Sequence, residues 1–131
     1  MFEKELETAI SLAREAGRTV LEYYALEIIA EEKLVENARV VGEYLLGRLR
    51  ELADEFPGVV TNVRGRGLFT ALDLPDKETR DRALAACLEN GLIALASGQF
   101  AIRFRPALNL SRGEADEGAR KLRRAIAAAR G

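Results

Sequence analysis

Hydrophobic and small residues recur every three or four positions over the first 56 residues, which is the spacing of one helix face. The first stripe comprises Phe2, Leu6, Ala9, Ile10, Ala13, Gly17, Val20, Leu21 and Tyr24. The second comprises Leu34, Val35, Ala38, Val41, Leu45, Leu49, Leu52 and Phe56. One helix over both stripes would be about 80 Å long. The pattern therefore predicts two helices, with a break near Glu32 and Lys33, and Pro57 ends the second at Phe56.

Two pairs of short β-rich runs follow, each interrupted by turn residues. The first pair, 59–63 and 68–72, flanks the glycine-rich turn 64–67. The second pair, 92–96 and 100–104, flanks a Ser-Gly-Gln sequence. Runs of this length around such residues are typical of β-hairpins.

Two further helices complete the pattern. A helix over 75–88 is closed by Asn90 and Gly91, residues that tolerate a left-handed cap. The last helix runs to about residue 129 and follows Ser111 and Glu114, which have capping-box spacing. The order α-α-β-β-α-β-β-α predicts an α+β fold. We expect a small, mainly antiparallel sheet covered by helices, with a long helical N-terminal region.

Composition narrows the class of protein. The 131 residues have the size of one domain, so we predict a single domain over 1–131. Twenty basic and 21 acidic residues nearly cancel, which gives no attraction for nucleic acid or an anionic membrane. No apolar run approaches the roughly 20 residues of a membrane span, and the N-terminus has no leader pattern. With one cysteine, Cys87, and no intramolecular disulfide, we expect a soluble cytoplasmic protein.

The residue types argue against independent catalysis. The chain contains no histidine, the commonest general base and metal ligand, and a single cysteine cannot form a zinc cluster. Cys87 lies in a helical stripe with Leu84 and Leu88, and is interpreted as a small buried hydrophobic residue. We therefore expect no catalytic residue and no metal site.

Two arginine motifs are candidates for binding. Arg64, Gly65, Arg66 and Gly67 could offer backbone amides and guanidinium groups to an anion, although a hairpin turn explains the glycines equally well. Over 101–106, strand alternation puts Arg103 and Arg105 on the face opposite Ile102 and Phe104. An arginine there can hold a carboxylate with two parallel hydrogen bonds, or it can pair with surface acids on an exposed face. The residues alone favour the turn and the exposed face.

Several short stretches carry a family resemblance that changes this balance. They are LEII and ENA between 26 and 38, VGEYL at 41–45, VRGRGL at 63–68 and IRFRP at 102–106. From about residue 25 to 131 the chain resembles the small C-terminal domain of class III (fold type I) pyridoxal-phosphate aminotransferases. It is most similar to the lysine 6-aminotransferase group. The resemblance implies that Arg103 binds a substrate carboxylate, such as that of a small dicarboxylate, with Arg105 as a neighbour.

The departures from that family also matter. The sequence does not show the large domain that holds the Schiff-base lysine and the cofactor phosphate site, so we expect no bound cofactor. Residues 1–24 resemble instead the first helix of inositol monophosphatase-type phosphatases, in FEKEL at 2–6 and AREAG at 13–17. This predicts a chimera joined near Tyr24 and Ala25, whose purpose is to fold.

Two alternatives to the chimera remain open. One is a carboxylate-binding module that works through Arg103. The other is an aminotransferase fragment that needs a separate large domain. Loss of the large domain would also leave apolar surface uncovered, and this predicts a homo-oligomer.

Overall fold

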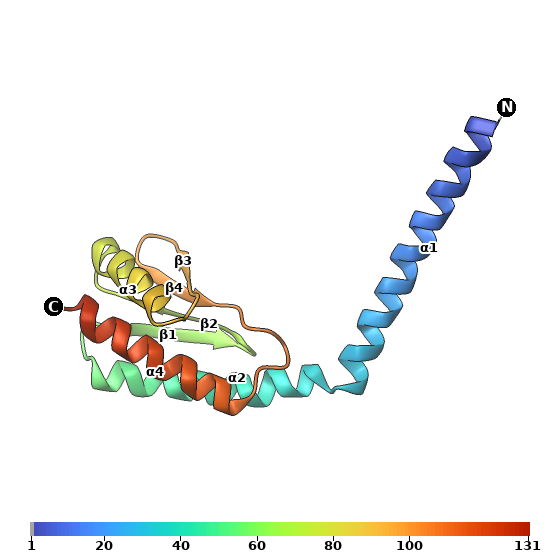
Figure 1. The fold of residues 1–131 in the computed structure, drawn as a ribbon. Coiled ribbons are helices and arrows are strands. Elements are labelled where there is room, and N and C mark those ends of the chain that lie inside the picture. The colour runs from blue at the N-terminus through green and yellow to red at the C-terminus, as the bar shows by residue number, and fades with distance from the viewer. Residues whose placement is uncertain (1) are drawn as a thin grey trace. The chain divides into compact units, whose positions relative to one another are not determined.

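The computed structural model describes residues 2–131, which form four helices and one four-stranded sheet (Figure 1). The chain divides into two units, the first ending at Val35 and the second comprising Glu36–Gly131. The hydrophobic core belongs entirely to the second unit. The organisation of the chain as one domain stays a prediction.

The N-terminal region forms two helices, as its stripes predict. Helix α1 spans Phe2–Glu31 and helix α2 spans Leu34–Glu55. Between them Lys33 adopts a positive φ of 51°, a left-handed conformation that cannot continue a right-handed helix. Helix α1 is amphipathic, and a single helix cannot bury its own apolar stripe. No residue of Phe2–Glu31 is buried.

The sheet is antiparallel throughout, which confirms the predicted α+β fold. Its strands are β1 (Thr61–Arg66), β2 (Phe69–Asp73), β3 (Leu95–Ser97) and β4 (Ala101–Phe104), in the spatial order β1-β2-β4-β3. Both predicted hairpins are present, and β2 and β4 are the two inner strands.

The first hairpin turns later than predicted. Strand β1 includes Arg64, Gly65 and Arg66, so only Gly67 and Leu68 lie between the strands. Gly67 has a φ of 56°, which a residue with a side chain rarely adopts. The predicted four-residue turn is therefore wrong. Two residues close this hairpin because the glycine supplies the conformation that a tight turn requires.

Both predicted C-terminal helices are present, and the first of them begins at Lys77 rather than at residue 75. Helix α3 spans Lys77–Glu89, and the Asp76 side chain caps it by accepting a hydrogen bond from the Thr79 amide. Helix α4 spans Arg112–Ala129 and begins with the complete capping box of Ser111 and Glu114. No helix within residues 2–131 has the length and apolar character needed to cross a bilayer.

The core of the second unit packs helices α2, α3 and α4 against the sheet. The largest fully buried side chains of this unit are Leu49, Leu72, Leu74, Ile102, Leu122, Ile126, Thr70 and Cys87. At one end, α2 approaches the β1–β2 turn closely enough that Gly42 faces the backbone of Gly67. Only a residue without a side chain fits at that contact.

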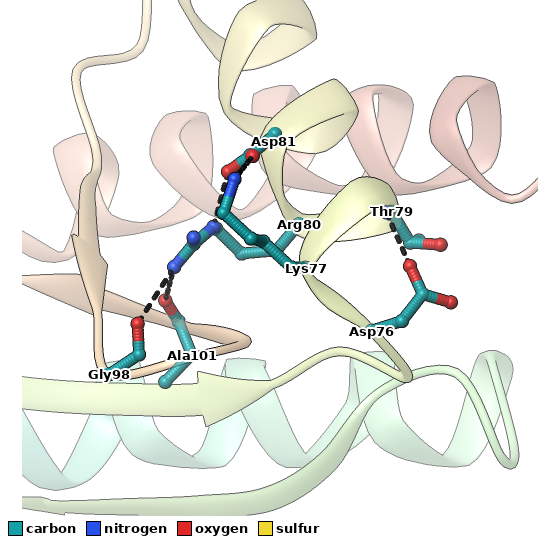
Figure 2. Close-up of polar contacts among 7 residues, drawn as sticks. All are labelled: Asp76, Lys77, Thr79, Arg80, Asp81, Gly98 and Ala101. Carbon is teal, nitrogen blue, oxygen red and sulfur yellow. Dashed lines mark hydrogen bonds and ion pairs between the residues drawn. The ribbon is translucent and has the colours of Figure 1, made fainter.

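A buried arginine connects α3 to the β3–β4 hairpin (Figure 2). Arg80 is 5% exposed, and its Nε donates to Asp81 at 2.6 Å. Its Nη1 lies 3.4 Å from the Gly98 carbonyl oxygen and 3.5 Å from that of Ala101. The guanidinium therefore satisfies main-chain acceptors at the hairpin turn while its charge is balanced by the carboxylate of Asp81.

Candidate functional site

Arg103 lies on the inner strand β4, opposite Ala71 of β2 and Leu95 of β3. Ile102 is fully buried and Phe104 packs against the core, so the Arg103 side chain belongs to the opposite face of the strand. Its Nε is buried and has no hydrogen-bond partner among residues 2–131. Such a donor is costly to leave unpaired. A carboxylate fits it well, because it accepts two parallel bonds from a guanidinium.

Arg105 follows directly after β4 and has a different environment. Its guanidinium carbon lies 5.7 Å from the centroid of the Phe69 ring, within the range of a cation–π contact. Phe69 begins β2, which pairs with β4. The contact holds Arg105 close to the strand that carries Arg103, and so adds a second positive charge there. The sequence does not indicate the partnership with Phe69, because it depends on which strands pair and in what register.

Both arginines also line an apolar cavity of about 230 Å³ in the second unit. The other lining residues come from α2, α4, β3, β4 and the segments beside these two strands: Leu45, Leu49, Leu92, Ile93, Leu95, Phe104, Pro106, Leu110, Glu114, Ala115, Gly118, Ala119 and Leu122. Glu114 already accepts hydrogen bonds from Ser111. The cavity lining therefore combines mostly apolar side chains with two cationic residues.

The structure gives the Arg64–Gly67 motif internal roles. Arg64 Nη1 pairs with Asp73 Oδ1 at 2.9 Å and donates to the backbone oxygen of Asn62. A side chain at Gly65 would come within 2.7 Å of a backbone oxygen of β2, and Gly67 forms the turn. The glycines are thus explained by hairpin packing. Anion binding by this motif stays a prediction that the geometry does not require.

Cys87 is fully buried in α3, and burial raises the pKa of its thiol to about 11. The thiolate is the reactive form of cysteine. Raising the pKa from 9.0 to about 11 lowers the thiolate fraction at pH 8 about a hundredfold. This environment agrees with the interpretation of Cys87 as part of the core.

We expect the native chain to react with a disulfide reagent at pH 8 at least about a hundred times more slowly than the urea-unfolded chain. Absorbance of the released thiolate measures both rates. Rapid stoichiometric labelling, with the circular dichroism spectrum unchanged, would show that Cys87 is accessible in the folded protein.

The described residues do not fit pyridoxal phosphate. A Schiff base with that cofactor requires a lysine in its site, yet no lysine lines the cavity beside Arg103. Lys77 pairs with Asp81, and Lys121 pairs with Glu117. Residues 2–131 also contain no cluster of three or more His, Cys, Asp or Glu side chains placed to hold a metal ion. The expected lack of a bound cofactor stays a prediction.

The fold and the sequence together define the class of protein. The family described as Aminotransferase class-III matches residues 16–126, and the chain belongs to that family. The match includes strand β4 with Arg103, all four strands of the sheet and α2 and α3 entirely.

Several of the proteins similar to this chain are lysine aminotransferases. The L-lysine-epsilon aminotransferase of Amycolatopsis lactamdurans is 43% identical over 103 residues, covering 78% of this chain and 23% of the relative. An alanine/serine racemase of Pyrococcus horikoshii is 37% identical over 109 residues. A solved lysine aminotransferase from M. tuberculosis is 40% identical with a TM-score of 0.79, covering 80% of this chain and 24% of that one. The chain thus spans about a quarter of the length of these enzymes.

The comparisons do not support the predicted join near Tyr24 and Ala25. The family match begins at residue 16, so residues 16–24 fall inside the aminotransferase match rather than outside it. The phosphatase resemblance rested on generic features of an amphipathic helix, whose apolar spacing many unrelated helices share.

Proposed function

We propose that this chain provides the carboxylate-binding part of a class III aminotransferase site, with Arg103 as the residue that holds the carboxylate. The observation that carries this proposal is the buried Arg103 Nε, which lacks a partner among residues 2–131. In this proposal the chain does not transaminate by itself. The cofactor and its lysine belong to another part of the enzyme, and the chain orients the acid end of the substrate toward them.

The surroundings of Arg103 support a small dicarboxylate as the ligand class. Arg105 adds a second cation near the same strand, held against Phe69. The apolar cavity beside the arginines can accept methylene groups. A ligand with two carboxylates joined by a short carbon chain is complementary to these two cations and this cavity.

A purely structural role is the weaker alternative. It was predicted together with a chimeric origin, and a family match over residues 16–126 leaves little sequence for a second parent. A role in folding alone would also give no reason for the unpaired donor of Arg103.

We expect 2-oxoglutarate to bind the full chain and the Arg103→Ala variant to bind it at least about tenfold more weakly. A hydrogen bond from a charged group contributes roughly 1.5–3 kcal/mol, which corresponds to that factor or more. Titration calorimetry at fixed ionic strength measures both dissociation constants. Arg103→Lys should fall between them, because lysine keeps the charge but loses the planar fork.

Arg124→Ala is the matched control, since it removes one positive charge from an exposed residue of α4 that does not line the cavity. We expect its affinity to stay within about twofold of the original, because exposed charges act weakly through solvent. If Arg124→Ala and Arg103→Ala weaken binding equally, the ligand responds only to net charge. The proposal is also rejected if Arg103→Ala leaves the affinity unchanged.

A further inference from the structure

The N-terminal half of α1 presents large apolar side chains to solvent. Phe2 is 82% exposed, Leu6 60% and Ile10 43%. The same face then continues with the small residues Ala13 and Gly17, and a side chain added at Gly17 would meet nothing within 4 Å. The stripe therefore has bulky side chains at its start and open space at its middle.

Charged residues follow one edge of this stripe. Glu3, Glu7, Arg14 and Arg18 are spaced four, seven and four residues apart, which places them on the same side of the helix. The acidic pair lies toward the N-terminus and the basic pair toward the middle of α1. None of the ion pairs found among residues 2–131 involves these four side chains.

We propose that α1 pairs with α1 of a second copy, antiparallel, about a two-fold axis near Ile10. In an antiparallel pair, neighbouring residues across the interface have numbers with a nearly constant sum, which is about 19 to 21 for this axis. Leu6 then faces Ala13 of the second copy, Phe2 faces Gly17, and Ile10 faces Ile10. Phe2 and Leu6 thus each meet a small residue, and the two Ile10 side chains meet at the axis, so the part of the stripe from Phe2 to Gly17 can pack against itself.

The charges fit the same register. With the helices antiparallel, the edge that carries the charges faces the same edge of the second copy. Glu7 then lies opposite Arg14, and Glu3 lies opposite Arg18. Symmetry doubles each pair, giving four Glu–Arg contacts. Only this register pairs both glutamates with both arginines, and a parallel arrangement forms none of them, because it brings opposite edges of the two helices together.

This pairing gives the predicted homo-oligomer a specific surface and does not depend on the proposed carboxylate site. The interface covers about five turns of helix on each copy, which is small for a stable dimer. We therefore expect a weak dimer, with a dissociation constant on the order of 10–100 µM.

Sedimentation equilibrium of the full chain between 5 µM and 1 mM tests the dimer through charge exchange. Glu7→Arg and Arg14→Glu each convert two attractive contacts into two like-charge contacts, and each should raise the dissociation constant about tenfold. The double variant Glu7→Arg with Arg14→Glu restores both pairs and should return within about twofold of the original value. A chain that stays monomeric at 1 mM, or a dimer insensitive to the single variants, overturns the proposal.

Disulfide trapping tests the antiparallel direction separately. A mixture of Leu6→Cys and Ala13→Cys chains should form a mixed disulfide-linked dimer, while Leu6→Cys alone should crosslink at least about tenfold more slowly. The reverse result would show a parallel pair and reject the register. Circular dichroism of every variant checks that the chain still folds. The dissociation constant for 2-oxoglutarate should be the same in every variant, so failure of this dimer can be told apart from failure of the carboxylate site.

Discussion

Gly42→Ala is expected to destabilise the second unit by about 3 kcal/mol or more. A methyl group at this position would lie 2.2 Å from the carbonyl oxygen of Gly67 and 2.3 Å from its carbonyl carbon. These are backbone atoms of the β1–β2 turn, and that turn is fixed by the positive φ of Gly67. Neither partner can rotate away, so α2 must shift from the sheet and lose packing across the core.

Urea denaturation followed by circular dichroism measures the free energy of unfolding. Gly47→Ala is the control, because Gly47 lies in the same helix and a side chain there meets nothing within 4 Å. We expect that change to stabilise the chain by about 0.5–1 kcal/mol, since alanine favours a helix interior. Equal effects of the two substitutions would show that helix propensity, rather than the contact with Gly67, determines the result.

Arg80→Ala is expected to destabilise the same unit by about 3 kcal/mol. The substitution removes a side chain that is 6% exposed and leaves the carbonyls of Gly98 and Ala101 without their donor. It also removes the volume that fills the space between α3 and the β3–β4 hairpin. We expect the hairpin to become more mobile, because β3 has only three residues to hold it in the sheet.

Lys77→Ala is the control for charge, because Lys77 and Arg80 both pair with Asp81. The Lys77 side chain is 72% exposed, so its ion pair is screened by solvent and should contribute less than about 0.5 kcal/mol. Urea denaturation measures both variants, and amide hydrogen exchange over 95–104 reports on the hairpin. Similar losses in the two variants would mean that Arg80 acts through Asp81 alone.

Part of the candidate site was accessible from the sequence. The alternation in 101–106 puts Ile102 and Arg103 on opposite faces of a strand, and in the structure Ile102 is the residue that enters the core. The family resemblance singled out Arg103 as the carboxylate residue, and the chain does belong to the class III aminotransferases. The contact of Arg105 with Phe69 and the shape of the apolar cavity were not accessible, because both depend on strands and helices brought together by folding.

The sequence by itself determined the local structure of this protein. The two N-terminal helices and the capping box at Ser111 are set by residues within a few positions of one another, and all of them form as predicted. Such features depend on backbone hydrogen bonds and short-range sterics, which adjacent residues supply. The order of elements and the hairpins follow from the same local signals.

Only the tertiary structure decided the long-range contacts. Gly65 appeared to be a turn residue, yet it lies within β1 because the strand pairs through it with β2. Nothing near Gly42 in the sequence indicates that the Gly67 backbone packs against it, and nothing near Arg80 indicates its burial at the β3–β4 turn. For Gly42 and Arg80 the partner lies at least 18 residues away along the chain. The energy of such a contact depends on distances that exist only after the elements have packed.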